Sequence, residues 1–66
     1  MHVIVNNQPK ELAQDAVLKE LLSSLEIATN GIAVAINNTV IPKSNWNVTK
    51  LSNDDIVTII QATQGG

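Results

Sequence analysis

A stripe of apolar residues at helical spacing is the clearest pattern along the chain. The stripe consists of Val17, Leu18, Leu21, Leu22 and Leu25. Residues that recur at intervals of three and four lie on one face of an α-helix, and the polar residues between them cover the opposite face. Asp15 precedes the stripe with a side-chain acceptor and a negative charge, which favour a helix N-cap at that position. The pattern therefore predicts one amphipathic helix that begins after Asp15 and ends before Thr29.

Five shorter stretches predict strands, and four of them are rich in β-branched residues. They are residues 1–5, about 10–13, 32–36, 39–41 and 56–61. Asn6, Asn7 and Gln8 end the first stretch as a turn. Asn37 and Asn38 separate the third stretch from the fourth as a two-residue hairpin loop, because Asn tolerates positive φ. Pro9 lacks a backbone N–H, so the second stretch is predicted to be an edge strand.

This order of elements predicts an α+β fold, in which one main helix packs across a mixed sheet of about five strands and buries the leucine stripe. Trp46 lies in the polar segment 43–50 and is the only aromatic residue. Its volume favours a place in the core over a role as an exposed binding anchor. We expect residues 1–66 to form one domain, in which 62–66 are a flexible C-terminal tail.

The composition removes several classes of function. The chain has 66 residues, no cysteine, one histidine and a formal net charge of −2, so disulfides, cysteine catalysis and cysteine-bound zinc are excluded. The basic residues are all lysines and form no stripe, which argues against nucleic-acid binding. The longest apolar run, 32–36, is far shorter than a membrane span, and no secretion signal is visible. A cytoplasmic protein without a membrane segment is therefore expected.

The candidate catalytic groups favour structural roles. Asp54 and Asp55 form the only adjacent pair of carboxylates, but the residues before them are typical of a turn. His2 has no second histidine or paired acid in its neighbourhood, so a solvated position is expected. Lys43 and Lys50 flank the tryptophan and could contact either solvent or a partner. The sequence has no phosphate-binding loop, metal-ligand spacing or nucleophile–base pair, and we do not expect an enzyme.

The terminal residues Gly65 and Gly66 are the strongest remaining candidates for chemistry. They are two of the three glycines in the chain. Without side chains they can enter a narrow enzyme tunnel and present the last carbonyl to another group, although a frayed terminus could have the same composition. The ionised carboxylate is a poor electrophile. Adenylation by ATP would activate it toward sulfur, giving a thiocarboxylate, or toward an amine, giving an isopeptide bond.

The order of elements and the diglycine end resemble the ubiquitin-like β-grasp sulfur carriers, in particular the ThiS family of thiamine biosynthesis. Two segments carry most of the resemblance: residues 35–46, AINNTVIPKSNW, and residues 51–61, LSNDDIVTIIQ, with the diglycine that follows. The helical segment KELL at 19–22 also fits. Lys43 departs from the family pattern, in which many members carry arginine. The resemblance covers the whole chain.

The resemblance implies that this chain is a substrate of other enzymes. A ThiF-type, E1-like adenylyltransferase would use ATP to adenylate Gly66, and the chain itself would bind no cofactor. Sulfur passed ultimately from cysteine by a desulfurase would convert that end to a thiocarboxylate. A ThiG-type thiazole synthase would recognise the tail, including Gln64 and Gly65, and take the sulfur into the thiazole ring of thiamine.

Three other functions remain open at this point. A MoaD-type carrier for molybdopterin synthesis also ends in diglycine, although those chains tend to be longer and richer in aromatic residues. A ubiquitin-like modifier would be joined to lysines through the same end. A passive β-grasp interaction module would carry its diglycine by chance.

Alternation along the strands predicts a docking patch for the partners. Successive side chains of a strand point to opposite faces of a sheet, so a helix-facing Val57 leaves Thr58 and Ile60 on the open face. The same rule places Ile4 and Ala35 on that face. We therefore predict a partner-docking patch of Ile4, Ala35, Thr58 and Ile60 beside the tail. The alternative is that these are singly exposed apolar residues of the ordinary kind.

Overall fold

The computed structural model describes residues 1–61. In chain order the elements are β1 (His2–Val5), β2 (Gln8–Glu11), α1 (Leu18–Ser24), β3 (Ile32–Ile36), β4 (Thr39–Ile41), the 3₁₀ helix η1 (Lys43–Asn45) and β5 (Ile56–Gln61). Strands β3, β4 and β5 have the bounds that the sequence predicts. The predicted tail, 62–66, lies outside the described residues.

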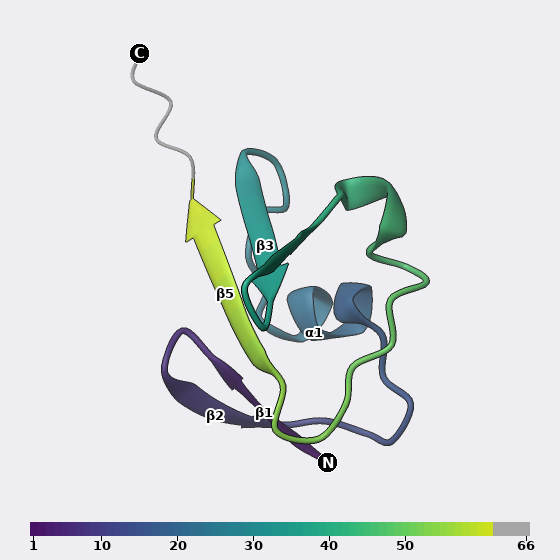
Figure 1. Cartoon of the computed structure of the whole chain (residues 1–66). Coiled ribbons are helices and arrows are strands. Elements are labelled where there is room, and N and C mark those ends of the chain that lie inside the picture. Colours follow the sequence, from purple (N-terminus) through teal and green to yellow (C-terminus); the bar gives the residue numbers. More distant parts are fainter. Residues whose placement is uncertain (62–66) are drawn as a thin grey trace.

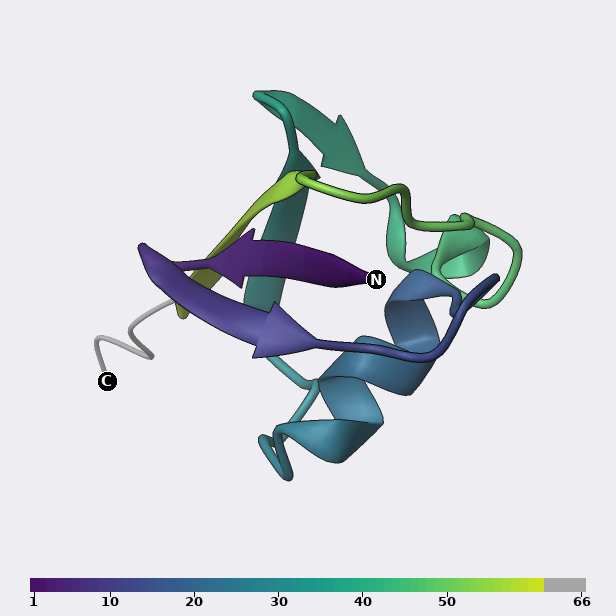
Figure 2. The ribbon, with the colours of Figure 1, turned by 90° about the horizontal axis from the view of Figure 1, so that it is seen from below.

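The strands form one mixed sheet, and α1 packs across one of its faces (Figures 1 and 2). The strand order is β2-β1-β5-β3-β4. Neighbouring strands are antiparallel except for β1 and β5, which run parallel. The predicted α+β fold, with one helix over a sheet of five strands, is confirmed. In the part of the chain that the structure describes, no helix is long and apolar enough to cross a membrane.

Both hairpins turn on pairs of asparagines. The two-residue loop at Asn37 and Asn38 is as predicted, whereas the first turn was predicted to include Gln8, which instead begins β2. Asn6 and Asn7 join β1 to β2 with φ angles of 48° and 70°, and Asn37 and Asn38 join β3 to β4 with 49° and 71°. Two successive residues with positive φ match the right-handed twist of the flanking strands, and Asn adopts this conformation at low cost. The hairpin registers therefore follow from local sequence.

Strand β2 begins earlier than predicted. It covers Gln8–Glu11 rather than 10–13, and Pro9 lies inside it, paired with Ile4. The strand is at the edge of the sheet, where proline's missing N–H leaves no ladder partner unsatisfied. The prediction of an edge strand is confirmed, but its predicted bounds are wrong, because an edge strand can include a proline.

The start of α1 also differs from the prediction, because Asp15 is not its N-cap. The helix begins at Leu18, and Asp15 lies in a turn with a φ of 64°. The backbone N–H of Val17 donates to Glu20 Oε1 at 2.9 Å, and the N–H of Leu18 donates to the carbonyl of Thr49 at 2.8 Å. A hydrogen bond to a distant segment therefore satisfies a backbone donor that the sequence pattern assigned to a local cap.

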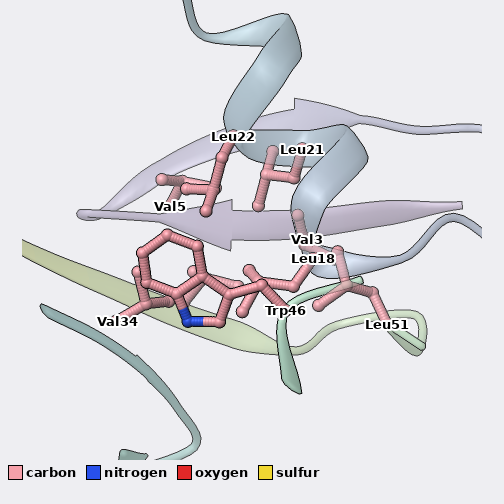
Figure 3. Packing of buried hydrophobic residues seen from close by; sticks show 9 residues of the cluster. Val3, Val5, Leu18, Leu21, Leu22, Val34, Trp46 and Leu51 are labelled. Carbon is pink, nitrogen blue, oxygen red and sulfur yellow. The ribbon is translucent and has the colours of Figure 1, made fainter. Parts of the chain in front are cut away.

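The core lies between α1 and the sheet and is closed by Trp46 (Figure 3). Its buried residues are Val3, Val5, Leu18, Leu21, Leu22, Val34, Trp46, Leu51 and Val57. The indole is 5% exposed, and its Nε1–H donates to the carbonyl of Ile41 at 2.9 Å. This confirms the prediction that Trp46 is a core residue, since its ring is buried and its single polar group is paired.

Candidate functional site

The segment that ends in the diglycine continues from β5, a strand inside the sheet. β5 pairs with β1 on one side and with β3 on the other, and Gln61 is the last residue that the structure describes. The predicted tail-recognition residues Gln64 and Gly65, and the predicted modified residue Gly66, lie outside the described residues. The structure describes β5, the strand that precedes these residues in the sequence. We call its last residue, Gln61, the base of the terminal segment.

Two asparagine side chains hold β5, one at its first residue, Ile56, and one at Ile59. Asn37 Oδ1 accepts a hydrogen bond from the N–H of Ile56 at 3.0 Å, and its Nδ2–H donates to Asp55 Oδ1 at 3.0 Å. Asn6 Oδ1 accepts from the N–H of Ile59 at 2.9 Å, and its Nδ2–H donates to the carbonyl of Ile59 at 3.2 Å. The sequence indicated these asparagines as turn residues only. Their positions in the turns gave no signal that they would also pair with β5.

The four residues predicted as a docking patch share the sheet face that α1 leaves open. Cross-strand partners lie on the same face, and the register pairs Ile4 with Ile56 and Ala35 with Thr58. Ile60 is on the same face by alternation and is 59% exposed. The predicted sharing of a face is therefore confirmed. That a partner docks there stays a prediction.

The open face is more apolar than the predicted patch. Ile56, paired with Ile4, is 52% exposed, and Val40, paired with Ala35, is 67% exposed. The predicted patch did not include these two residues, although alternation along β4 and β5 places both of them on this face. We use the name "open face" for the set Ile4, Ala35, Val40, Ile56, Thr58 and Ile60.

His2 and the adjacent aspartates form a surface turn and not a concave site. His2 Nε2 lies 2.8 Å from Asp54 Oδ1, and the two side chains are 46% and 69% exposed. Asp55 Oδ2 accepts a hydrogen bond from the N–H of Ser52 at 2.7 Å. The turn prediction is confirmed, while the pairing of His2 with Asp54, 52 residues apart, was not foreseen. Within residues 1–61 no three metal-ligating side chains gather.

The two lysines that flank Trp46 are placed differently. Lys43 begins η1, and Lys50 forms an isolated bridge with Val17 that ties the loop to the start of α1. Lys43 lies beside Lys19 and Trp46 around a shallow hollow. Both lysines are exposed, and their contact with a partner stays a prediction.

The strand order, the one α-helix found in residues 1–61 and the central position of β5, after which the terminal segment follows in the sequence, define a ubiquitin-like β-grasp domain. The chain belongs to the ThiS family, whose model matches residues 3–66. This result agrees with the resemblance carried by the segments 35–46 and 51–61.

Individual members of the family are similar over the full length. The sulfur carrier protein ThiS of Escherichia coli (strain K12) is 29% identical over 66 residues, which cover 100% of both chains. The crystal structure of the thiamine biosynthesis protein ThiS from Geobacter metallireducens superposes with a TM-score of 0.85 at 28% identity, covering 100% of both chains. A solution structure of a thiamine biosynthesis protein from the same organism gives 0.78 at 28% identity, covering 100% of this chain and 88% of the other.

Proposed function

We propose that the chain carries sulfur as a thiocarboxylate on Gly66 for the thiazole ring of thiamine. Membership of the ThiS family makes the chain a sulfur carrier protein of thiamine biosynthesis and not an enzyme. The observation that carries the assignment to Gly66 is that the family match runs to residue 66, through the diglycine. Its physical support is β5, which places the base of that segment inside the sheet.

The proposed chemistry needs an activation step, since an ionised carboxylate is a poor acceptor for a nucleophile. A ThiF-type adenylyltransferase would supply ATP, and a Gly66 carboxylate oxygen would attack the α-phosphorus with loss of pyrophosphate. A desulfurase would take sulfur from cysteine as a persulfide, and the persulfide sulfur would displace AMP to give an acyl disulfide. A thiol reductant would then cleave the S–S bond, leaving the thiocarboxylate on Gly66 and a disulfide as the oxidised product. The chain contributes the terminal carboxylate and binds no cofactor of its own. Because the step consumes ATP, we place the protein in the cytoplasm.

Partner docking is assigned to the open face. Ile56, Ile60 and Val40 each expose more than half of their surface there, which is typical of a surface that another protein covers. The face lies on β5, the strand that leads into the terminal segment. An adenylating enzyme and a ThiG-type thiazole synthase that bind this face would both find Gly66 within reach, because five extended residues span about 16–18 Å.

Intact-mass spectrometry tests the proposal directly. The chain is incubated with its cognate adenylating enzyme, ATP and a sulfur source, and the thiocarboxylate is expected as replacement of one oxygen by sulfur. The control is the chain without Gly66. An unchanged mass with an enzyme that is active on another carrier would overturn the proposal. Conjugates to lysine side chains would instead identify a ubiquitin-like modifier.

A further inference from the structure

A groove of about 450 Å³ lies on the helix side of the sheet, where β5 ends. Val5, Ile32 and Ile59 line it from the strands, and Leu25 and Ile27 line it from the segment that follows α1. The turn between β1 and β2 reaches the same end of the sheet as the end of β5 (Figure 2). The groove is therefore beside the base of the terminal segment and on the opposite side of the sheet from the open face.

The groove stays open because β2 turns polar side chains toward the helix. Val5 and Val3 of β1 are buried, and their cross-strand partners Gln8 and Lys10 share that inner face. Apolar residues at these two positions would extend the core under β2. Ile27, on the far wall, is instead left 36% exposed. The result is an apolar groove with a basic residue at its margin.

Lys10 brings a positive charge to this groove. Its side chain is half-buried, and no carboxylate in residues 1–61 lies within 4.0 Å of its ammonium group. Partial burial of an ammonium group is unfavourable unless an anion accompanies it. The site therefore favours a ligand that carries a carboxylate next to an apolar group.

The backbone of β5 offers a further contact at the groove. Hydrogen-bonding groups alternate sides along a strand, and the N–H of Ile59 points toward β1, where Asn6 receives it. The N–H and carbonyl of Gln61 point the same way by this alternation. β1 has ended at Val5 by then, and the Asn6 side chain reaches only Ile59. In the described chain, the side of β5 at Gln61 is consequently an open strand edge.

We propose that this groove binds an extended segment of the adenylating enzyme, added as a short strand beside Gln61. One apolar side chain of that segment enters between Ile27 and Ile59, and a neighbouring carboxylate pairs with Lys10. Main-chain hydrogen bonds at a strand edge, with pockets for alternate side chains, are a recurrent mode of peptide recognition. The inference rests on the proposed function for the identity of the enzyme. It adds a second contact, on the other side of the sheet from the open face.

Matched charge variants test the proposal on the full chain. Binding of Lys10→Glu to the cognate adenylating enzyme is measured by titration calorimetry and compared with that of Lys19→Glu, an equal charge change at an exposed position outside the groove. We expect Kd to rise at least about 10-fold for the first variant and less than about 2-fold for the second, at equal thermal stability. Equal affinities for the two variants would overturn the proposal.

A second pair of variants separates the apolar contact from the charge. Ile27→Glu is expected to weaken binding by at least about 10-fold, while Val48→Glu, at a position that is exposed and outside the groove, is expected to leave it unchanged. Nuclear Overhauser contacts in the free chain between residues 62–66 and Ile27 would make the chain's own tail the occupant and overturn the proposal. The proposal would also be overturned if sedimentation shows that the wild-type chain is a dimer and that Ile27→Glu is a monomer. The mass assay tests the proposed function independently of these binding measurements, because a wild-type chain that stays unmodified in that assay would contradict the proposed function alone.

Discussion

The side-chain amide of Asn6 pairs with both backbone groups of Ile59, 53 residues further along the chain. Its Oδ1 accepts at 2.9 Å and its Nδ2–H donates at 3.2 Å. β1 ends one residue earlier, at Val5, so the amide takes the place that a further β1 residue would have in the sheet. One turn residue thereby holds the strand that leads to Gly66.

Replacing Asn6 with glycine is expected to lower stability by about 1–2 kcal/mol, since two modest hydrogen bonds are lost while glycine keeps the positive φ without strain. Urea unfolding followed by circular dichroism measures the change. Asn7→Gly is the matched control, because Asn7 also has a positive φ of 70°, and no side-chain hydrogen bond of Asn7 is found among residues 1–61. We expect the control to change stability by less than about 0.5 kcal/mol.

Amide hydrogen exchange locates the effect of the same substitution. The N–H of Ile59 should exchange faster in Asn6→Gly than in the wild type. The N–H of Ile4, which donates to the backbone carbonyl of Asp55 at 2.9 Å, should keep its protection. Equal losses of protection at both amides would show that the substitution destabilises the whole sheet. That result would contradict a local role for the Asn6 side chain at Ile59.

Trp46 offers a test of core packing against partner binding. Trp46→Ala is expected to cost about 3–5 kcal/mol, which is a large part of the stability of so small a domain. Trp46→Phe keeps most of the ring but leaves the carbonyl of Ile41 without its donor, and we expect a cost of about 1–3 kcal/mol. Urea unfolding measures both. A phenylalanine variant of unchanged stability but weaker partner affinity would identify a binding anchor instead.

The open face is tested by introducing a charge at Ile60. Ile60→Glu is expected to fold with a loss of about 1 kcal/mol or less, because the side chain is 59% exposed. Its KM as a substrate of the adenylating enzyme should rise at least about 10-fold, since a buried charge would face the partner. Pyrophosphate exchange measures the KM. Val48→Glu is the matched control at 68% exposure; similar KM values for both variants would show that the enzyme does not use this face.

Deletion of Gly66 distinguishes the thiamine pathway from molybdopterin synthesis. The chain is expected to fold as before, because the buried core residues found among 1–61 end at Val57, with Ile59 packed against them, but the terminal carbonyl is displaced by one residue from its place in the enzyme. A strain that carries the deletion should require thiazole for growth and retain molybdoenzyme activity. The converse phenotype would assign the chain to the MoaD-type reaction.

Local sequence patterns were enough to predict much of this fold. The leucine stripe predicted α1, the asparagines predicted the positions of both turns, and alternation along β5 separated the buried Val57 from the exposed Ile60. Each of these features depends on residues within a few positions of one another, where helix and strand periodicity act. The resemblance through the diglycine likewise needed no coordinates.

Contacts between distant segments of the chain could not be predicted from local sequence patterns. The sequence pattern placed the helix cap at Asp15, whereas the N–H of Leu18 meets the carbonyl of Thr49, and nothing local indicated that Asn6 would reach Ile59 or that His2 would meet Asp54. Periodicity specifies which face a side chain takes but not which remote strand lies beside it. The sequence was enough for the elements, their faces and the chemistry expected at Gly66. Only the tertiary structure decided that β1 pairs in parallel with β5, that Asn6 bonds Ile59 and that a groove lies beside the end of β5. These contacts form only when segments some 50 residues apart are brought together.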